Sequence, residues 1–431
     1  MTSGVARERT GLPRRVAMLS LHTSPLAPLG GRETGGMNVY VHEVAARLAA
    51  IGVAVDVFTR RASASEPAVT EFAHTGARAR LIAITAGPKS RIEKEEMFDL
   101  TTTFADGVEA FRAREGIAYD IIYSHYWLSV EAGAILARRW DAPHAGMFHT
   151  LAEVKLRARA SESEPPERIE AERRLVHGLD RIVAATEHER RLLMQIYRVP
   201  AERITVIPLG VDLEQFTPGD RAAARARLNL EQWGIAGDDR LLLAVGRIEP
   251  LKGLDILIRA LAQLNERPLP DGGAVLAIIG GDDRAETDIA RLRALAEDLG
   301  VADAVYFLGP RPHEALPDFY RAADVVVVPS FYESFGLVAV EAMASGVPVV
   351  ASRVGGLAST VADGRTGYLI AWRCPEPFAE KIEVLLRNEQ LRAALGAGAA
   401  ERMRTYSWDA VAEAVGGLLG AMTGASVPAT R

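Results

Sequence analysis

Short apolar runs alternate with amphipathic helical patterns along nearly the whole chain. This alternation is typical of βα units, in which parallel strands lie buried between two layers of helices. The runs fall into two series, so we expect two doubly wound, Rossmann-like α/β domains. The first series comprises residues 16–21, 54–58, 81–84, 121–123, 145–148, 181–184 and 205–207, and the second comprises 241–245, 275–279, 305–308, 325–328 and 348–351.

The boundary between the two series falls in a turn-rich segment around Pro208 to Asp212. We therefore predict a first domain over residues 1–211 and a second over 212–405, which a chain of 431 residues accommodates. Ligands of doubly wound sheets bind at the carboxyl ends of the strands. Two such domains facing each other would form a cleft suited to two substrates.

Composition and net charge limit the kinds of partner that the protein is expected to bind. The net charge is −6 and the isoelectric point about 5.9, which argues against a surface for nucleic acid or anionic membranes. Cys374 is the only cysteine, so an intrachain disulfide is excluded. No apolar run approaches the ~20 residues of a membrane span. We expect a cytoplasmic protein with small-molecule partners and no membrane insertion; the sequence leaves open whether it forms a homodimer.

The segment from Val325 to Ala351 carries the most specific chemistry. Four valines end at Pro329, as expected of a buried strand, and the residues up to Ala344 favour a helix. The first N–H groups of a helix lack intrahelical partners and lie at its positive end, which suits a pyrophosphate. We therefore predict a phosphate site formed by the backbone of Gly336, Leu337 and Val338.

Two carboxylates flank this helix start. Glu333, in the loop, is placed to accept hydrogen bonds from a hexose, and Glu341, on the helix, from a ribose. An alternative is an ordinary capped helix with Glu333 in its solvated first turn. Arg247 and Lys252 follow another predicted strand, and two cations there would neutralise a diphosphate. The alternative interpretation of Arg247 and Lys252 is that they are two surface cations beside the start of a helix.

The acidic pair Asp282-Asp283 also follows a predicted strand in the second domain. No third acidic ligand is apparent nearby, so we interpret the pair as turn or capping residues. We expect no metal in the site and no required cofactor.

The first domain contains candidate residues at corresponding places. Gly35 and Gly36 would allow backbone N–H groups to approach a phosphate where the first long helix begins, although such loops are common. His149 follows the end of a predicted strand and is therefore a candidate for the catalytic site. The alternative interpretation is that His149 is a core histidine whose hydrogen bonds are satisfied within the protein. Lys94 and Arg168 lie in charged segments next to predicted helix starts, where two exposed cations are the ordinary interpretation.

The Glu333–Glu341 segment, with its flanking Ser-Phe-Gly and Gly-Val-Pro-Val-Val, resembles that of the retaining glycosyltransferases of family 4, which have the GT-B fold. The resemblance covers roughly residues 14–420. It implies two facing Rossmann-like domains and a C-terminal helix, about 406–423, that crosses back to the first domain. In the first domain, motifs around His22, Thr34 and Phe58 resemble enzymes that glycosylate inositol 3-phosphate. The loop with Lys94 resembles that of sucrose-phosphate synthases as well. Both resemblances imply that Lys94 and Arg168 clamp a phosphomonoester, which an arginine can bind in a bidentate manner.

These resemblances imply a hexosyltransferase that uses UDP-glucose or UDP-N-acetylglucosamine and a phosphorylated polyol or sugar. An inositol phosphate ranks above fructose 6-phosphate, and a non-catalytic protein that binds nucleotide sugars is an alternative of another class. The implied roles fall into three groups. The catalytic group is His149, Arg247, Lys252 and Glu333; the donor group is Gly35, Gly36, Arg311, Gly336, Leu337, Val338 and Glu341; and the acceptor group is Asn38, Lys94, Tyr126, Thr150 and Arg168.

Overall fold

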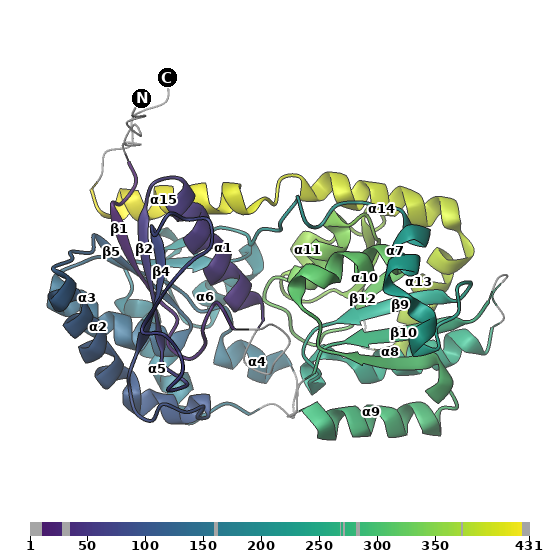
Figure 1. Cartoon of the computed structure of the whole chain (residues 1–431). Helices are drawn as coiled ribbons and strands as arrows, with labels where there is room; N and C mark the ends of the chain where they lie inside the picture. Colours follow the sequence, from purple (N-terminus) through teal and green to yellow (C-terminus); the bar gives the residue numbers. More distant parts are fainter. Residues whose placement is uncertain are drawn as a thin grey trace, which may run out of the picture. The chain divides into compact units, whose positions relative to one another are not determined.

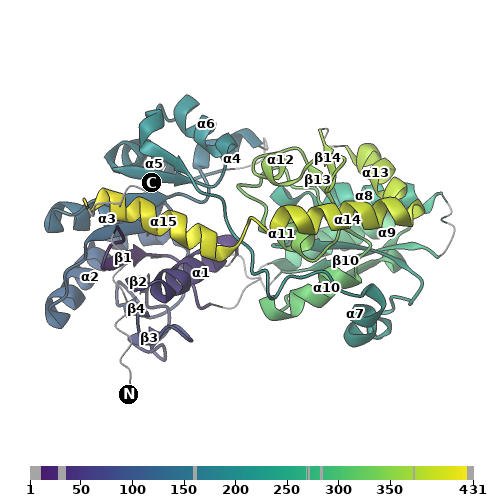
Figure 2. The ribbon, with the colours of Figure 1, turned by 90° about the horizontal axis from the view of Figure 1, so that it is seen from above.

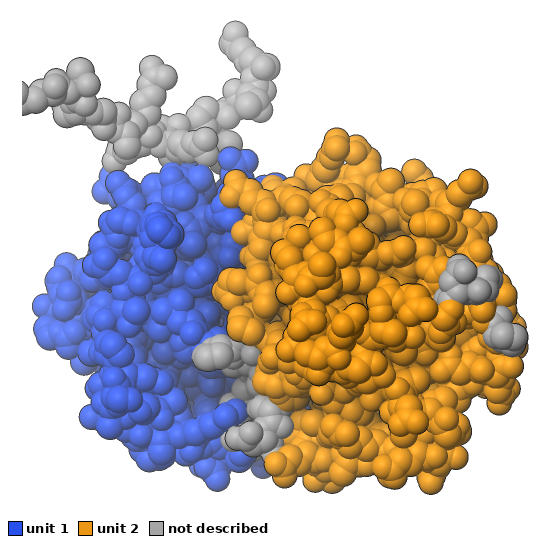
Figure 3. Space-filling view, turned by 45° about the vertical axis from the view of Figure 1, so that its right-hand side comes forward, with its two compact units in different colours: residues 1–27, 37–208, 408–431 blue, residues 28–36, 209–407 orange. Residues whose placement is uncertain are grey.

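The computed structural model describes residues 11–27, 35–158, 163–267, 269, 272–281, 285–371 and 374–424. The chain divides into two compact units, shown in different colours in Figure 3. Unit 1 comprises residues 1–27, 37–208 and 408–431, and unit 2 comprises residues 28–36 and 209–407. The predicted division lies within a few residues of these limits but placed Gly35 and Gly36 in the first domain, whereas the structure groups them with unit 2.

Unit 1 contains an eight-stranded sheet in the order β3-β4-β2-β1-β5-β6-β7-β8. Every pair of neighbouring strands is parallel except β3 with β4, which is antiparallel. The strands are β1 (Arg15–Leu19), β2 (Ala54–Arg60), β3 (Val69–Glu71), β4 (Ala79–Ile84), β5 (Ile121–His125), β6 (His144–Met147), β7 (Arg181–Ala184) and β8 (Ile204–Val206).

The helices of unit 1 include the last helix of the chain. They are α1 (Gly36–Ala50), α2 (Thr101–Glu115), α3 (Trp127–Trp140), α4 (Ala152–Ala158), α5 (Pro166–Gly178), α6 (Glu187–Gln195) and α15 (Trp408–Met422), with the 3-10 turns η1 (Lys94–Leu100) and η2 (Ala201–Arg203). The helix α15 packs against α1, where Trp408 lies edge-on to Tyr40 and Gly416 faces Leu48. The predicted return of a C-terminal helix to the first domain is therefore confirmed, and both views of the ribbon show it (Figures 1 and 2).

Unit 2 contains a fully parallel six-stranded sheet in the order β11-β10-β9-β12-β13-β14. Its strands are β9 (Arg240–Val245), β10 (Ala274–Ile279), β11 (Val305–Gly309), β12 (Val325–Val328), β13 (Val349–Ser352) and β14 (Gly367–Ile370). Its helices are α7 (Arg221–Leu228), α8 (Leu254–Asn265), α9 (Glu286–Asp298), α10 (Leu316–Ala322), α11 (Leu337–Ala344), α12 (Leu357–Thr360), α13 (Pro375–Arg387) and α14 (Glu389–Met403), with the 3-10 turns η3 (Leu230–Trp233), η4 (Pro250–Lys252), η6 (Ala302–Ala304) and η7 (His313–Ala315).

The core of unit 2 follows from the two-residue period of its strands. Alternate residues such as Leu242 and Ala244, or Val325 and Val327, point to one face of the sheet and pack with α8 and α13. The residues between them, such as Leu243 and Val326, are also fully buried, because helices including α10 and α11 cover the other face (Figure 1). Burial on both faces explains why these strands are continuous apolar runs.

Each of the twelve predicted strands is present, with ends within two residues of the predicted ones. Two further strands were not predicted. The edge strand β3 is only three residues long and half-exposed, so it has no apolar pattern. The strand β14 begins at Gly367, where a Cβ would lie 1.9 Å from the carbonyl oxygen of Val349 on β13. The first position of β14 therefore requires glycine. Because glycine has no apolar side chain, the strand lacks the continuous apolar run that predicts the other strands of this sheet.

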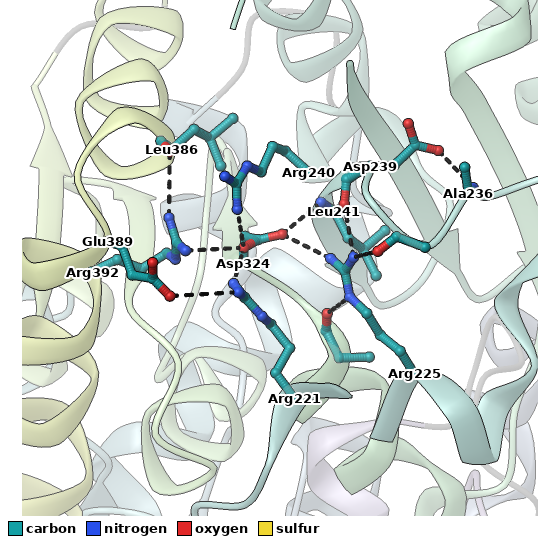
Figure 4. A network of polar contacts seen from close by, with 12 residues as sticks. Arg221, Arg225, Ala236, Asp239, Arg240, Leu241, Asp324, Leu386, Glu389 and Arg392 are labelled. Atoms are coloured by element: carbon teal, nitrogen blue, oxygen red, sulfur yellow. Dashed lines mark hydrogen bonds and ion pairs between the residues drawn. The ribbon is translucent and has the colours of Figure 1, made fainter. Parts of the chain in front are cut away.

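A buried carboxylate joins several elements at the amino ends of β9 and β12 (Figure 4). Asp324 is 2% exposed and lies among four arginines. Its Oδ2 accepts from Arg225 Nη2 at 2.8 Å and from the N–H of Leu241 at 2.9 Å. The other arginines, which pair with Oδ1, are Arg221, Arg240 and Arg392. This network connects α7 and α14 to the sheet, as expected of a structural rather than a ligand-binding charge.

Within the described residues, no helix has the length and apolar character needed to span a membrane.

Candidate functional site

Unit 2 has a pocket at the point where its strand order reverses. The sheet grows in opposite directions from β9 and β12, and ligands of doubly wound sheets bind at such a switch point. The pocket lies at the carboxyl ends of these strands and includes Arg247, Lys252 and Glu333. Its lining is Ala244, Val245, Gly246, Arg247, Lys252, Leu254, Ile278, Val327, Val328, Pro329, Ser330, Glu333 and Val338.

Lys252 and Glu333 form an ion pair in this pocket. The Nζ of Lys252 donates to Oε2 of Glu333 at 2.7 Å, and the side chains are 22% and 17% exposed. Arg247 pairs with Glu249 at 3.0 Å. Glu333 precedes α11 by four residues, so it lies in the loop and not in the first helical turn. The structure thus brings Lys252 and Glu333 together, as the sequence suggested for a shared ligand.

Glycines allow the loop that carries Glu333 to pack tightly. Gly355 has φ 47°, and a Cβ there would lie 1.8 Å from the carbonyl oxygen of Glu333. The N–H of Gly356 donates to the same carbonyl at 2.9 Å. On the other side, a Cβ on Gly253 would lie 2.2 Å from the carbonyl oxygen of Pro329. These contacts fix the backbone that presents Glu333 and Lys252.

The helix α11 begins at the predicted phosphate site. Gly336 precedes it with φ 94° and ψ 53°, a conformation that favours glycine. Glu341 differs from the expectation of an available carboxylate, because it is buried and each oxygen already accepts a hydrogen bond. Oε1 pairs with Nε2 of His313 at 2.7 Å, and Oε2 accepts from Tyr320 Oη at 2.8 Å. A ribose would have to use the remaining lone pairs.

Two other predicted donor residues, Gly36 and Arg311, belong to unit 2. A Cβ on Gly36 would lie 3.0 Å from Cδ1 of Leu337, so Gly36 lies close to the first residue of α11. The guanidinium of Arg311 lies 5.3 Å from the ring centroid of Trp233. Its Nε is buried and makes no hydrogen bond within the described residues. Arg311 therefore stacks on an aromatic ring of the chain itself.

In unit 1, two predicted site residues have unusual backbone conformations at consecutive strand ends. Tyr126 follows β5 with φ 72° and ψ 152°, a region occupied almost only by glycine. His149 follows β6 with φ 61°. Such conformations cost on the order of 1–3 kcal/mol each and persist where the surroundings impose them, often at functional sites. Both side chains are buried, at 6% and 8% exposure.

His149 lies in a cluster of aromatic rings. Its Nε2 is 3.1 Å from Nδ1 of His125, and its ring is edge-on to that of Tyr40. Burial lowers the pKa of His149 to about 3, so the imidazole is neutral near pH 7. Burial together with His149 lowers the pKa of His125 well below its usual range. The neutral rings of His125 and His149 share one hydrogen bond. His149 is therefore suited to hydrogen bonding with a hydroxyl group rather than to acting as a cation.

Arg168 is neither exposed nor unpaired, which corrects one of the two sequence interpretations. Its side chain is 2% exposed and makes ion pairs of 2.7 Å with Glu164 and with Glu172. Its Nη2 donates to the carbonyl and the hydroxyl of Thr150, each at 3.0 Å. The guanidinium also lies 4.9 Å from the ring centroid of Tyr126. The structure therefore brings together three predicted acceptor residues, with carboxylates that were not predicted.

The two remaining acceptor candidates lie in the same unit. Asn38, in the first turn of α1, donates from Nδ2 to Oγ1 of Thr23 at 2.8 Å and to the carbonyl of Ser24 at 2.7 Å. Lys94 begins η1. Burial and the charges of Lys94, His149 and Arg168 lower the pKa of His22 to about 3, and the ring of His22 lies 4.4 Å from that of Tyr126. Lys94 is thus electrostatically coupled to the Tyr126–Arg168 cluster.

The described part of the chain contains no group of three or more metal-ligating side chains. Asp282 and Asp283 lie outside the described residues, so their predicted turn role stays a prediction.

Several residues that complete these clusters were missed by sequence reasoning. Glu164 and Glu172 lie four residues either side of Arg168, a spacing that signals paired charges on a helix. His125 stands one residue before the predicted Tyr126. His313 and Tyr320 carry no signal in the sequence, since they reach Glu341 only through tertiary packing.

Comparisons with known proteins assign the class. The family model described as Glycosyltransferase Family 4 matches residues 34–215, and that described as Glycosyl transferases group 1 matches residues 226–402. The chain belongs to these glycosyltransferases, and it is a hexosyltransferase with the GT-B fold.

Three relatives show how far the similarity extends. A D-inositol 3-phosphate glycosyltransferase of Nocardiopsis dassonvillei is 44% identical over 411 residues, which is 94% of each chain. The structure of sucrose-phosphate synthase from Thermosynechococcus elongatus has 34% identity and a TM-score of 0.86, covering 96% of this chain and all of its own. The fold is also shared with Anabaena Alr3699/HepE, solved in complex with UDP-glucose, at 21% identity and a TM-score of 0.73, covering 94% of this chain and 99% of that one.

Proposed function

We propose that this protein is a retaining glycosyltransferase that moves a hexose from a UDP-sugar to D-inositol 3-phosphate. The observation that carries the proposal is the chain-long identity of 44% to an enzyme named for that acceptor, together with a buried Arg168–Tyr126–Thr150 cluster at strand ends of unit 1. The proposal is also supported by the pocket at the switch point of unit 2, whose lining includes Arg247, Lys252, Glu333 and Val338.

The proposed donor site is the pocket of unit 2. Arg247 and Lys252 would neutralise the diphosphate, and the positive end of α11 would bind it through the N–H groups of Leu337 and Val338. Glu333 would accept hydrogen bonds from the hexose, and Glu341 from the ribose. The neighbour solved with UDP-glucose supports a uridine nucleotide, and the sugar is glucose or N-acetylglucosamine.

The proposed acceptor site is in unit 1. Lys94 and Arg168 would bind the phosphate, assisted by the hydroxyl of Thr150. Asn38 and Tyr126 would contact the ring of the acceptor, and His149 would position a hydroxyl of the transferred sugar. Arginine suits this task because its planar fork matches the oxygens of a phosphate.

Retention of configuration would follow a front-face substitution. The acceptor hydroxyl oxygen forms a bond to the anomeric carbon as the bond from that carbon to the diphosphate breaks. The leaving diphosphate oxygen takes the proton of the acceptor hydroxyl. Arg247, Lys252 and the start of α11 would stabilise the negative charge that develops on the leaving group.

Transfer of glucose to fructose 6-phosphate is the second candidate. It is supported by the similarity to sucrose-phosphate synthase, which spans 96% of this chain. A phosphomonoester is common to both acceptors, so the Arg168 cluster supports either. We rank the inositol acceptor first because the identity to the relatives named for it is higher.

A screen of two donors against two acceptors tests the proposal. UDP-glucose and UDP-N-acetylglucosamine are each incubated with D-inositol 3-phosphate or fructose 6-phosphate, and UDP release and product mass are recorded. We expect one UDP-sugar to give a glycosylated inositol phosphate. A sucrose phosphate product would select the second candidate. Donor binding without acceptor-dependent UDP release would instead indicate a non-catalytic protein.

A further inference from the structure

Arg168 has too few available donors for the role that the proposed function assigns to it. A guanidinium carries five N–H groups. Nε donates to Glu172 at 2.7 Å, Nη1 to Glu164 at 2.7 Å, and Nη2 to both oxygens of Thr150. Among the described residues, these contacts leave one N–H of Nη1 without a partner. A phosphate cannot approach Nη1 in a bidentate manner while Glu164 occupies it.

The surroundings of Glu164 are those of an anion site. Its side chain is 4% exposed and lies between Arg168 and Lys155, whose Nζ donates to Oε1. Burial alone would raise the pKa of the Glu164 carboxyl, but Arg168, Lys155 and, at longer range, Lys94 hold that pKa below its ordinary value. One carboxylate is thus surrounded by three cations, two of which are the predicted phosphate ligands.

The second carboxylate on Arg168 is held differently. Glu172 is fully buried, and its Oε2 accepts from the N–H of Ala152 at 2.8 Å and from Tyr197 Oη at 2.9 Å. Glu172 is therefore fixed by groups from other elements. Within the described residues, the Glu164 carboxylate pairs only with Arg168 and Lys155, both cations that a phosphate would also bind. Of the two carboxylates, Glu164 is the exchangeable one.

We propose that Glu164 occupies the position of the acceptor's phosphate in the unliganded protein, and that the phosphate displaces it and is bound by Arg168, Lys155 and Lys94. This inference rests on the proposed function and adds two residues to the site: Glu164 as an internal competitor and Lys155 as a phosphate ligand.

The exchange is favourable because a phosphomonoester carries about −1.5 to −2 charges near pH 7, against −1 for a carboxylate. It also avoids exposing Arg168 as a buried, unpaired cation, since one anion replaces the other. The same arrangement disfavours unphosphorylated acceptors, because they cannot replace the Glu164 carboxylate. Glu164 would therefore contribute to specificity for phosphorylated acceptors.

The test compares Glu164→Gln with a control variant, Glu153→Gln, which removes another negative charge from the same unit. Glu153 lies on α4, and its carboxylate pairs with Arg173 and Arg157 rather than with Arg168. Binding of inorganic phosphate to the full chain is measured by calorimetry with UDP present, so that the donor diphosphate site is filled. We expect Glu164→Gln to bind phosphate about tenfold more tightly than the wild type, and Glu153→Gln to be unchanged.

Lys155→Gln provides an independent measurement if Glu164→Gln does not fold. It should raise KM for D-inositol 3-phosphate about tenfold and leave KM for the UDP-sugar unchanged. Folded Glu164→Gln with unchanged or weaker phosphate binding would overturn the inference, as would an equal gain in Glu153→Gln. A wild-type enzyme that uses inositol as well as its phosphate would instead refute the proposed function, while the calorimetry would still report on the anion site.

Discussion

The Nζ of Lys252 lies 2.7 Å from Oε2 of Glu333 at the carboxyl edge of the unit 2 sheet. The two residues are far apart in the chain, and they are brought together because η4 follows β9 and the Glu333 loop follows β12, its neighbour in the sheet. A cation and a carboxylate therefore share one pocket. A sugar diphosphate offers a partner to each of them.

Lys252→Ala and Glu333→Gln should each reduce turnover at least about a hundredfold, because each removes a group aimed at the donor in the transition state. Stability should change by only about 0–1 kcal/mol, since the pair is partly exposed. Steady-state UDP release and chemical denaturation measure the two effects. Arg267→Gln is the control: it breaks the 2.7 Å pair with Glu383 in the same unit and should leave turnover intact. Full activity in both site variants would refute the site.

Gly355→Ala should impair donor use, because its Cβ would meet the carbonyl of Glu333 at 1.8 Å and displace that loop. We expect KM for the UDP-sugar to rise at least about tenfold while KM for the acceptor stays constant. Gly364→Ala is a matched control, since Gly364 also has positive φ, 72°, but nothing lies within 4 Å of its Cβ position. Equal effects of the two substitutions would mean that backbone conformation, and not the clash with Glu333, is responsible.

Asp324→Asn should destabilise unit 2 by about 3–5 kcal/mol, because it leaves buried and partly buried arginines without their shared counter-charge. Figure 4 shows how these side chains converge on the carboxylate. Asp318→Asn removes a carboxylate that also pairs with two arginines, Arg227 and Arg321, but is 29% exposed, so its cost should be about 0–1 kcal/mol. Urea denaturation followed by tryptophan fluorescence compares them. Similar losses would show that Asp324 does not hold the elements together.

Stability should fall as the pH drops below about 6.5, the ordinary histidine pKa. Burial lowers the pKa of His22, His144 and His149 to about 3, and burial together with His149 lowers that of His125 well below its ordinary value. Below pH 6.5 the unfolded chain binds protons that the folded protein does not, which costs at most about 1.4 kcal/mol per pH unit for each histidine.

Two buried glutamates act in the opposite direction. Burial raises the pKa of Glu189 to about 7 and also raises that of Glu172, so the folded protein takes up their protons first as the pH falls towards 4.5. The four histidines outnumber them, so the net change remains a loss of stability. Denaturation midpoints at about pH 7 and about pH 5 measure it. A midpoint that rises on acidification would contradict the assignment of buried, neutral histidines.

The sequence predicts best where local pattern and tertiary structure agree. Val325–Val328 is a strand with the predicted ends, because four β-branched residues buried on both faces leave little alternative. The start of α11 is likewise predicted to within one residue. The loop ends in a left-handed backbone conformation, which glycine adopts readily, and Gly336 stands at that position. In both places the positions of the candidate site residues follow directly from the element boundaries.

The cluster of Arg168, Tyr126 and Thr150 shows which features a sequence pattern cannot predict. The spacing of Glu164, Arg168 and Glu172 is that of charges on an exposed helix, and the burial of Arg168 comes from Tyr126 and Thr150 on other elements. The backbone of Tyr126 has a conformation that no propensity favours for tyrosine. Such features depend on tertiary packing and so appear only in the structure.

The central claim is that the enzyme transfers a hexose to a phosphorylated acceptor. The most direct test compares kcat/KM for D-inositol 3-phosphate with that for unphosphorylated inositol, at saturating UDP-sugar and with UDP release as the signal. Loss of charge-assisted contacts to the phosphate should reduce kcat/KM at least about a thousandfold for inositol. Equal kcat/KM for the two acceptors, or UDP release that does not depend on an acceptor, would contradict the account.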